Sequence, residues 1–336
     1  MVCPGPPYLD FTRRWCKLSK MKRILSIRGG GIRGIIPCCH LVELEKQTNQ
    51  LTRDVIDFVG GTSTGALLTA CVVAGVEAQA ALEVYTKQGT TVFSPTNSVG
   101  RDTKLLVNGH MFDNQVLHQV ALETLGGAAT MTMNDSPIGI MITAGDQMGM
   151  PWYFVKDAPT NAKTTGKAPL VDAAVASACA TTYHAPWLIP GFGYFADGGT
   201  VSLADPVYQT MAEAFNGPGK CYGSIDPADA LVVSLGTGYY KPNSMPAPPG
   251  NLLSEISWVT SSLVSSSETI ALQAANRQWP KLVTVFDSAL WADIDEAEVS
   301  AIPRLLELGQ ADAAKVDWKA VLKLPAPRPT GTAAGT

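Results

Sequence analysis

The sequence has few charged residues, no basic block and no long apolar run. Asp, Glu, Lys and Arg make up only 16% of the 336 residues, hydrophobic residues make up 46%, and the formal net charge is -4. Such a composition is typical of a chain with a large core and excludes a disordered or highly charged binding protein. The lack of a basic block gives no reason to expect a nucleic acid polymer as a partner.

No stretch reaches the roughly 18 uninterrupted apolar residues that a membrane span requires. Residues 1–20 contain no apolar core of the kind that signal peptides have. We therefore expect a soluble protein whose contact with a membrane is at most peripheral.

Metal-binding spacings of cysteine and histidine are also missing. The seven cysteines are odd in number and irregularly spaced, at positions 3, 16, 38, 39, 71, 179 and 221. Cys38, Cys39, Cys71 and Cys179 lie in apolar helical stretches, which indicates buried small hydrophobes rather than disulfides. A reducing cytoplasm is the expected compartment. We expect neither a metal nor an organic cofactor.

What the sequence does contain is an alternation of short apolar strands with helical patterns. Strands are expected at 23–28, 54–59, 138–144, 151–155, 228–238 and 281–286, and the third and fourth are close enough in sequence to pair as a hairpin. Helices are expected at 32–48, 64–74, 77–88, 113–125, 169–180 and 252–278. This order predicts an α/β fold with a mostly parallel central sheet and helices on both faces. It also predicts an N-terminal extension (1–20), one catalytic domain (21–324) and a disordered tail (325–336).

The sharpest local motif is Gly-Thr-Ser-Thr-Gly at residues 61–65, between an expected strand and an expected helix. A nucleophile elbow needs this context, because a sharp turn lifts the serine out of the sheet and only small neighbours fit. The motif predicts Ser63 as a nucleophile. By itself it is equally compatible with an ordinary tight turn.

A second glycine motif, Gly29-Gly30-Gly31-Ile32-Arg33-Gly34, also follows a strand. Consecutive glycines expose backbone N–H groups, which suits an oxyanion hole. The same residues spell the G-x-G-x-x-G of dinucleotide-binding loops, with Asp54 at the spacing of a ribose-binding acid. That acid normally ends the second strand, whereas Asp54 would open it. A structural glycine turn is the third interpretation.

The base that would serve Ser63 is less obvious. All four histidines, His40, His110, His118 and His184, lie before the last 150 residues, whereas the histidine of an α/β-hydrolase triad comes last. Asp197, followed by Gly198 and Gly199, is the alternative, since a carboxylate that is partly desolvated can accept the serine proton. Asp-Gly-Gly is also an ordinary turn sequence.

Five motifs in order, GGGIRG, GTSTG, ASACATTYHAP, DGG and SLGTG, resemble those of the patatin-like phospholipases, over about residues 23–240. The resemblance implies a three-layer α/β fold and a Ser63–Asp197 dyad in place of a triad. It further implies an oxyanion hole from the loop of Gly29, Gly30, Gly31 and Arg33, and a nucleophile elbow formed with Gly61, Thr64 and Gly65. The implied activity is hydrolysis of phospholipids or other acyl-ester lipids, of phospholipase A or lysophospholipase type, without a cofactor.

The chain departs from the family pattern at three places. Arg28 stands where an acidic residue is common, Asp205-Pro206 replaces a frequent Asn-Pro, and residues 180–185 read ATTYHA rather than an Ala-Pro-x-Tyr-Phe-Pro run. We expect Arg28 to pair with a nearby carboxylate. Alternative functions are a dinucleotide-binding oxidoreductase that uses the loop 29–34, a nucleotide-signal-activated phospholipase effector, and a non-catalytic scaffold.

Overall fold

The computed structural model describes residues 21–325, except for residue 96, residue 251 and the segments 158–164, 217–224 and 242–249. The predicted N-terminal extension and nearly all of the predicted C-terminal tail lie outside the described residues.

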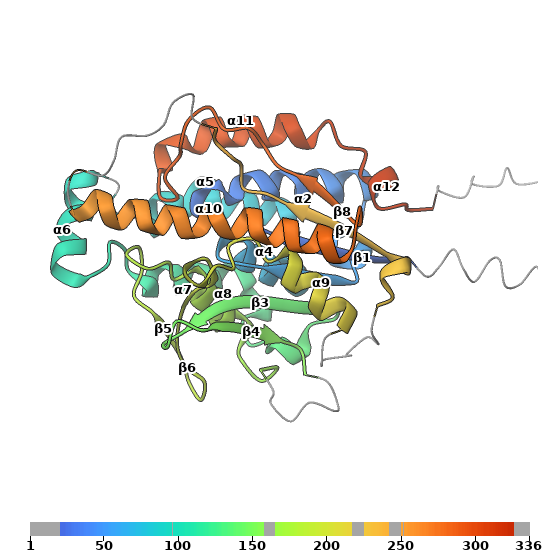
Figure 1. Cartoon of the computed structure of the whole chain (residues 1–336), viewed down its shortest axis with the longest axis horizontal. Helices are drawn as coiled ribbons and strands as arrows, with labels where there is room; N and C mark the ends of the chain where they lie inside the picture. Colours follow the sequence, from blue (N-terminus) through green and yellow to red (C-terminus); the bar gives the residue numbers. More distant parts are fainter. Residues whose placement is uncertain are drawn as a thin grey trace, which may run out of the picture.

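A mixed β-sheet forms the centre of the described part (Figure 1). Its eight strands are β1 (Lys22–Ile27), β2 (Phe58–Gly61), β3 (Gly139–Asp146), β4 (Pro151–Val155), β5 (Trp187–Ile189), β6 (Gly193–Asp197), β7 (Ala230–Leu235) and β8 (Val283–Phe286). The order is β5-β6-β3-β2-β1-β7-β8, and β4 pairs with β3 as an antiparallel hairpin. From β3 to β8 the neighbouring strands along this order are parallel. The predicted mostly parallel sheet is confirmed.

Helices cover both faces of this sheet. They are α2 (Ile35–Thr48), α3 (Thr52–Val55), α4 (Thr64–Ala74), α5 (Ala78–Val92), α6 (Ser98–Asn108), α7 (Asn114–Leu125), α8 (Leu170–Ala178), α9 (Val207–Asn216), α10 (Leu252–Gln278), α11 (Ile302–Ala313) and α12 (Trp318–Val321).

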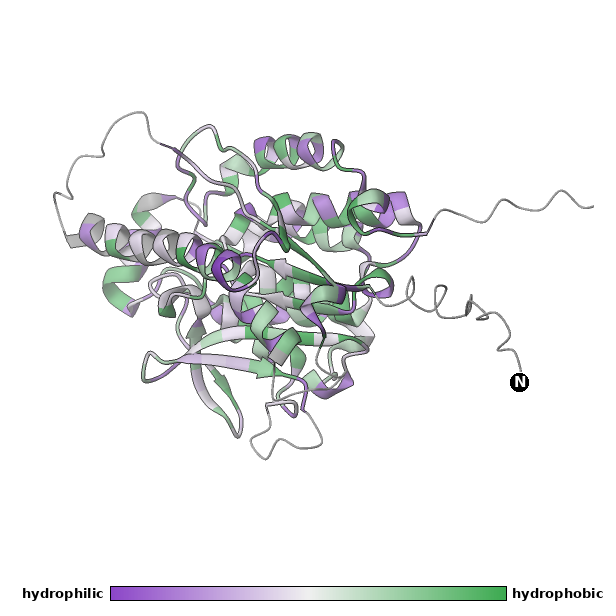
Figure 2. Ribbon diagram, turned by 45° about the vertical axis from the view of Figure 1, so that its right-hand side comes forward, coloured by the Kyte–Doolittle hydropathy of each residue, from purple (hydrophilic) through white to green (hydrophobic). Residues whose placement is uncertain are grey.

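Two apolar clusters separate the three layers. The larger contains Leu25 and Ile27 of β1 with side chains of α2, α4, α5, α7, α8 and α11. The smaller contains Ile24, on the opposite face of β1, with side chains of α9 and α10. Successive side chains of a strand point to opposite faces, so a strand buried on both sides reads as a continuous apolar run. Figure 2 shows hydrophobic residues along the central strands and hydrophilic ones on outward turns of the surrounding helices.

The carboxyl ends of β2, β1 and β7 lie side by side, with Ile27 opposite both Gly61 and Leu235. The chain connects β1 to β2 on one side, and β7 joins β1 on the other. The order therefore reverses at β1, the place where open α/β sheets bind their ligands. The predicted elbow follows β2, the predicted glycine loop follows β1, and the Gly-Thr-Gly at 236–238 follows β7.

The predicted strand 54–59 is partly wrong. Residues 52–55 form the single helical turn α3, and β2 begins at Phe58. The carboxylate of Glu45 fixes this turn by accepting hydrogen bonds from the N–H and the hydroxyl of Thr52, at 2.9 Å each. Asp54 is exposed in this turn, away from the end of β2.

Candidate active site

Ser63 sits in a strained turn between β2 and α4. Its backbone has φ 56° and ψ -125°, a conformation that non-glycine residues rarely adopt. The Ser63 N–H donates a 2.8 Å hydrogen bond to the hydroxyl of Ser177 in α8, and the residue is only 7% exposed. A nucleophile elbow has this geometry: a serine that directly follows a strand is held in a strained backbone conformation by the structure around it.

The glycines on both sides of Ser63 have a steric reason. A Cβ at Gly61 would collide with the carbonyl of Gly65, and a Cβ at Gly65 would collide with the carbonyl of Ile27 in β1. The start of α4 is thus packed directly against the end of β1. The Thr64 hydroxyl also hydrogen-bonds with that of Tyr85, which joins the elbow to α5.

Asp197 ends β6 and lies beside the elbow. Its carboxylate accepts a 2.6 Å hydrogen bond from the Gly199 N–H. Burial raises the pKa of Asp197 to about 7, the neighbouring Ser63 side chain and the Gly199 N–H oppose this rise, and the negative charge of Glu296 adds to it. A carboxylate with a pKa near neutrality is matched to proton transfer at neutral pH.

The glycine loop touches the elbow. A Cβ on Gly29 would lie 3.0 Å from the Ser63 Cβ. The Gly29 N–H donates to the Ala204 carbonyl at 2.9 Å, and its carbonyl accepts from the Thr237 hydroxyl at 2.6 Å. In the described part of the chain, the N–H groups of Gly30 and Gly31 have no acceptor. Of the three glycines, these two offer free donors, whereas Gly29 holds the loop in place.

Gly30 and Gly31 both require a glycine conformation. Their φ angles are +154° and +54°, and a Cβ on either would collide with Thr237 or with Glu296. Arg33, which the sequence analysis grouped with the oxyanion hole, holds the same loop from the side. Its Nε donates to the Gly30 carbonyl at 3.3 Å, and its guanidinium pairs with Glu296 at 3.3 Å.

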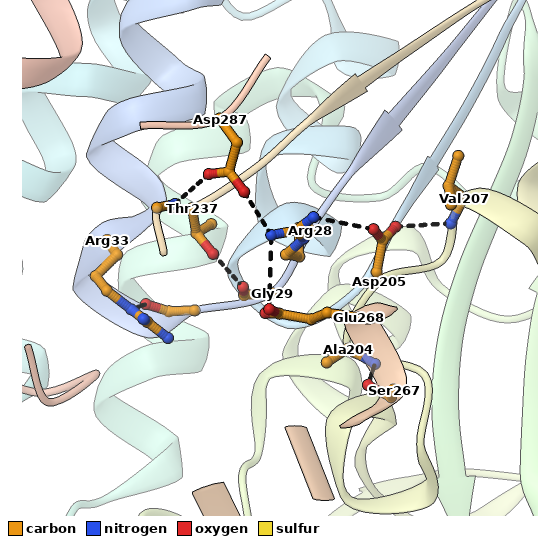
Figure 3. Close-up of polar contacts among 12 residues, drawn as sticks. Arg28, Gly29, Arg33, Ala204, Asp205, Val207, Thr237, Ser267, Glu268 and Asp287 are labelled. Carbon is orange, nitrogen blue, oxygen red and sulfur yellow. Dashed lines mark hydrogen bonds and ion pairs between the residues drawn. The ribbon is translucent and has the colours of Figure 1, made fainter. Parts of the chain in front are cut away.

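Arg28 lies behind the glycine loop among three carboxylates (Figure 3). It contacts Asp287 at 2.7 Å, Asp205 at 3.2 Å and Glu268 at 3.6 Å. The expected pairing of Arg28 with a carboxylate is confirmed. Burial raises the pKa of Glu268 to about 7, although the charge of Arg28 opposes that rise. Removing one partner of such a buried cluster leaves charges uncompensated.

A cavity of about 990 Å³, including the part open to solvent, is lined by Ser63 and by side chains of α4, α5, α7 and α8. Its wall is mostly aliphatic, with side chains such as Leu67, Cys71, Val92, Leu117 and Val171. The polar residues Tyr183, His184 and Glu296 line it together with Ser63 and Gly31. A long apolar space that ends at a serine fits an acyl chain whose carbonyl lies at that serine.

His40 and His118 are placed elsewhere, whereas His184 lines the same cavity as Ser63. His40 packs against Phe286 and Trp318, and His118 lies 3.2 Å from Asp172. His184 lies in the cavity wall against Phe93 and Phe112, and burial lowers its pKa to about 4. Asp197, not a histidine, is the titratable group that the structure brings to Ser63.

Several residues of this site were not predicted from the sequence. Ser177 and Thr237 lie inside motifs that were noticed, but no role was assigned to them. Glu268, Asp287 and Glu296 come from the last third of the chain, where isolated acids in helices and loops carry no signal.

Among the described residues, no group of three or more His, Cys, Asp or Glu side chains is placed to hold a metal ion. The helices of the described part are each too short or too polar to cross a membrane.

A comparison with known families matches residues 25–209 to the patatin-like phospholipases. This chain belongs to the patatin-like phospholipase family. The match includes Ser63, Asp197 and the glycine loop, and the predicted family is confirmed. It also places the chain among carboxylic ester hydrolases of lipids, rather than among dinucleotide-dependent oxidoreductases.

Two relatives illustrate the range of this family. The chain is 27% identical to a cGAMP-activated phospholipase of Vibrio cholerae, over 70% of this chain and 67% of that protein. It is 29% identical to patatin group M-2 of Solanum tuberosum, over 66% of this chain and 62% of that protein. The aligned region thus spans about two thirds of these relatives.

Solved structures with a similar arrangement are more distant. VipD from Legionella pneumophila has a TM-score of 0.39 and 11% identity, over 88% of this chain and 67% of that chain. The human GIVD cytosolic phospholipase A2 has a TM-score of 0.36 and 13% identity, over 93% of this chain and 62% of that chain.

Proposed function

We propose that this protein hydrolyses acyl-ester lipids, of phospholipase A or lysophospholipase type, through an acyl-enzyme on Ser63. The observation that carries the proposal is the position of a buried carboxylate, Asp197, beside Ser63, which lines an aliphatic cavity. Asp197 takes the proton of Ser63 as the hydroxyl oxygen attacks the ester carbonyl. The leaving alcohol receives this proton from Asp197. In the second step Asp197 takes a proton from water, the water oxygen attacks the acyl carbonyl, and the proton passes to the departing Ser63 oxygen.

The free N–H groups of Gly30 and Gly31 are the proposed donors to the oxyanion. They follow Gly29, which packs against Ser63. In the described residues no acceptor competes for these two N–H groups. Arg33 and Thr237 position the loop. Preorganised amides of this kind stabilise the negative charge that develops on the carbonyl oxygen.

The lipid would be met by peripheral contact with a membrane or micelle, and the protein would work in a reducing cytoplasm. The four described cysteines, Cys38, Cys39, Cys71 and Cys179, are free and buried, in keeping with that compartment.

A fluorophosphonate probe tests this function. We expect mass spectrometry to find the adduct on Ser63, and Ser63→Ala to abolish both labelling and release of fatty acid from phospholipid. Ser202→Ala is the matched control, because this serine lies nearby at a positive φ but outside the cavity lining. A folded wild type that forms no adduct and cleaves no acyl ester would contradict the proposal.

A further inference from the structure

Glu296 is a carboxylate at the polar end of the acyl cavity, and the proposed chemistry does not use it. It belongs to the segment between β8 and α11, beyond the region that matches the family. Its side chain is 23% exposed and lines the cavity together with Ser63, Gly31 and Tyr183. Glu296 therefore lies among the polar residues that line the cavity near Ser63.

The backbone around Glu296 is fixed to the glycine loop. The Ile32 N–H donates a 2.7 Å hydrogen bond to the Glu296 carbonyl, and Gly31 packs directly against Glu296. The neighbouring Asp295 accepts a 2.9 Å hydrogen bond from the Tyr183 hydroxyl and lies 3.7 Å from Arg101 of α6. The backbone of Glu296 is thus held against the glycine loop, and the neighbouring Asp295 contacts Tyr183 and Arg101.

The carboxylate of Glu296 forms an ion pair with the guanidinium of Arg33. The two side chains are 3.3 Å apart, and their exposed fractions are 23% and 13%. Burial raises the pKa of Glu296, and Arg33 opposes this rise. The other charged groups near this place are the acids Asp197, Asp295 and Glu268 and the cation Arg101, which is itself paired with Asp295 at 3.7 Å. Arg33 is therefore a cation that its surroundings already neutralise.

The direction of a bound substrate follows from the cavity. The acyl chain occupies the aliphatic part and its carbonyl lies at Ser63, so the alcohol part of the ester must lie toward the polar end. There it meets Glu296, Tyr183 and an imidazole that is neutral at neutral pH, because burial lowers the pKa of His184 to about 4. A headgroup with a net negative charge would find Arg33 and Arg101 already paired with Glu296 and Asp295.

We propose that Glu296 is a specificity-determining residue, which selects acyl esters whose headgroup carries no net negative charge. The inference rests on the proposed function. By pairing with Arg33, Glu296 neutralises the positive charge beside the glycine loop, which would otherwise attract an anionic headgroup. Neutral and zwitterionic headgroups are not penalised in this way.

The test compares two phospholipids with identical acyl chains, phosphatidylcholine and phosphatidylglycerol, each dispersed in a neutral detergent. The readout is the ratio of the two kcat/KM values. Changes in Asp197 or in the oxyanion hole act on both substrates and cancel in this ratio. We expect the wild type to prefer phosphatidylcholine, and Glu296→Gln to move the ratio about tenfold toward phosphatidylglycerol, because Arg33 is then left unpaired.

Two further variants separate charge from packing. Glu296→Asp keeps the charge and should keep the wild-type preference. Asp293→Asn removes the same formal charge from an exposed position in the same segment and should leave the ratio unchanged. Fluorophosphonate labelling of Ser63 shows for each variant that the site is folded and reactive, and the headgroup ratio does not depend on the absolute rate.

The outcomes distinguish this inference from the proposed function. A wild type that labels at Ser63 and cleaves lipid, with the same headgroup ratio in Glu296→Gln, overturns the role of Glu296 and leaves the function standing. Equal changes toward both lipids also overturn it, since they mean that Glu296 acts through the shared chemistry. A wild type that labels but cleaves neither lipid overturns it as well. No labelling and no hydrolysis by the wild type contradict the function itself.

Discussion

At the scale of single residues, Asp197 links activity to stability. Burial raises its pKa from the ordinary 3.8 to about 7, so the folded state holds a proton at pH values where the unfolded chain has lost it. Between about pH 4 and pH 7 the native state therefore binds more protons than the unfolded state, and this group makes stability fall as the pH rises. The unprotonated form needed for catalysis is the form that the fold disfavours.

Asp197→Asn should separate the two effects. We expect nearly complete loss of turnover, because an amide cannot accept the serine proton, while wild-type activity rises as the pH passes upward through about 7. We also expect the variant to gain stability over the wild type by roughly 2–3 kcal/mol more at pH 8 than at pH 5. Urea unfolding at both pH values measures this. An equal stability difference at pH 5 and pH 8 would mean that the fold does not penalise the carboxylate.

Only some of the residues of the candidate site could be predicted from the sequence. Ser63 and Asp197 stand in short motifs whose glycines have steric reasons, so local patterns were sufficient to predict them. Arg28 and Asp205 were both noticed as departures from the family pattern, but as separate ones. In the structure the two side chains form an ion pair at 3.2 Å, so the unusual arginine at position 28 is matched by the unusual aspartate at position 205. Their relation spans 177 positions, which no local pattern can express.

At the scale of secondary structure elements, α4 forms one wall of the proposed acyl site. Thr64, Leu67, Leu68, Ala70 and Cys71 of this helix line the cavity. From Ser63 to Cys71 the helix advances about 12 Å, at 1.5 Å per residue. The sequence predicts α4 and α8 as helices of small residues, but it does not say whether that smallness serves close packing or leaves an open space.

Cys71→Phe should shorten the cavity at its inner end. We expect the ratio of activity on a hexadecanoyl ester to activity on a butyryl ester to fall at least tenfold, because the ring fills space that only the longer chain needs. Assays with p-nitrophenyl esters of both lengths measure this ratio. Cys71→Ser, which fills no additional space, is the control. If both activities decline in parallel, the cavity is not the acyl site and the variant has only strained the core.

Helices and strands were predicted correctly where the apolar pattern was strong. The predictions failed where individual side-chain contacts determine the local structure. β1, β7, α4, α8, α10 and the β3–β4 hairpin have clear patterns. α3 was predicted as part of a strand because the sequence DVIDFV is apolar, yet Glu45 caps a helical turn there. The short strands β5 and β6 and the helix α6 were missed, since three to five residues, or a helix with a polar face, give little periodic signal.

At the scale of the whole molecule, the last third of the chain completes the site. Glu268 of α10 and Asp287 after β8 hold Arg28, and Glu296 supports the glycine loop. α12 is joined to the start of the sheet, because the Arg23 side chain donates to the Leu322 carbonyl at 2.7 Å. The segments before and after residue 209 thus contribute to one apolar cluster, and the single domain over residues 21–324 stays a prediction.

This sharing predicts one cooperative unfolding transition. If β8, α11 and α12 unfolded separately, Arg28 would be left buried among fewer carboxylates and the larger apolar cluster would open, so both regions should melt together. Differential scanning calorimetry should give a single peak with equal calorimetric and van't Hoff enthalpies, and loss of fluorophosphonate labelling should follow the same curve. A chain of this size often shows more than one transition, which makes the outcome informative. A first transition that leaves labelling of Ser63 intact would mean that the C-terminal elements form a separate unit and that Glu296 is dispensable for the site.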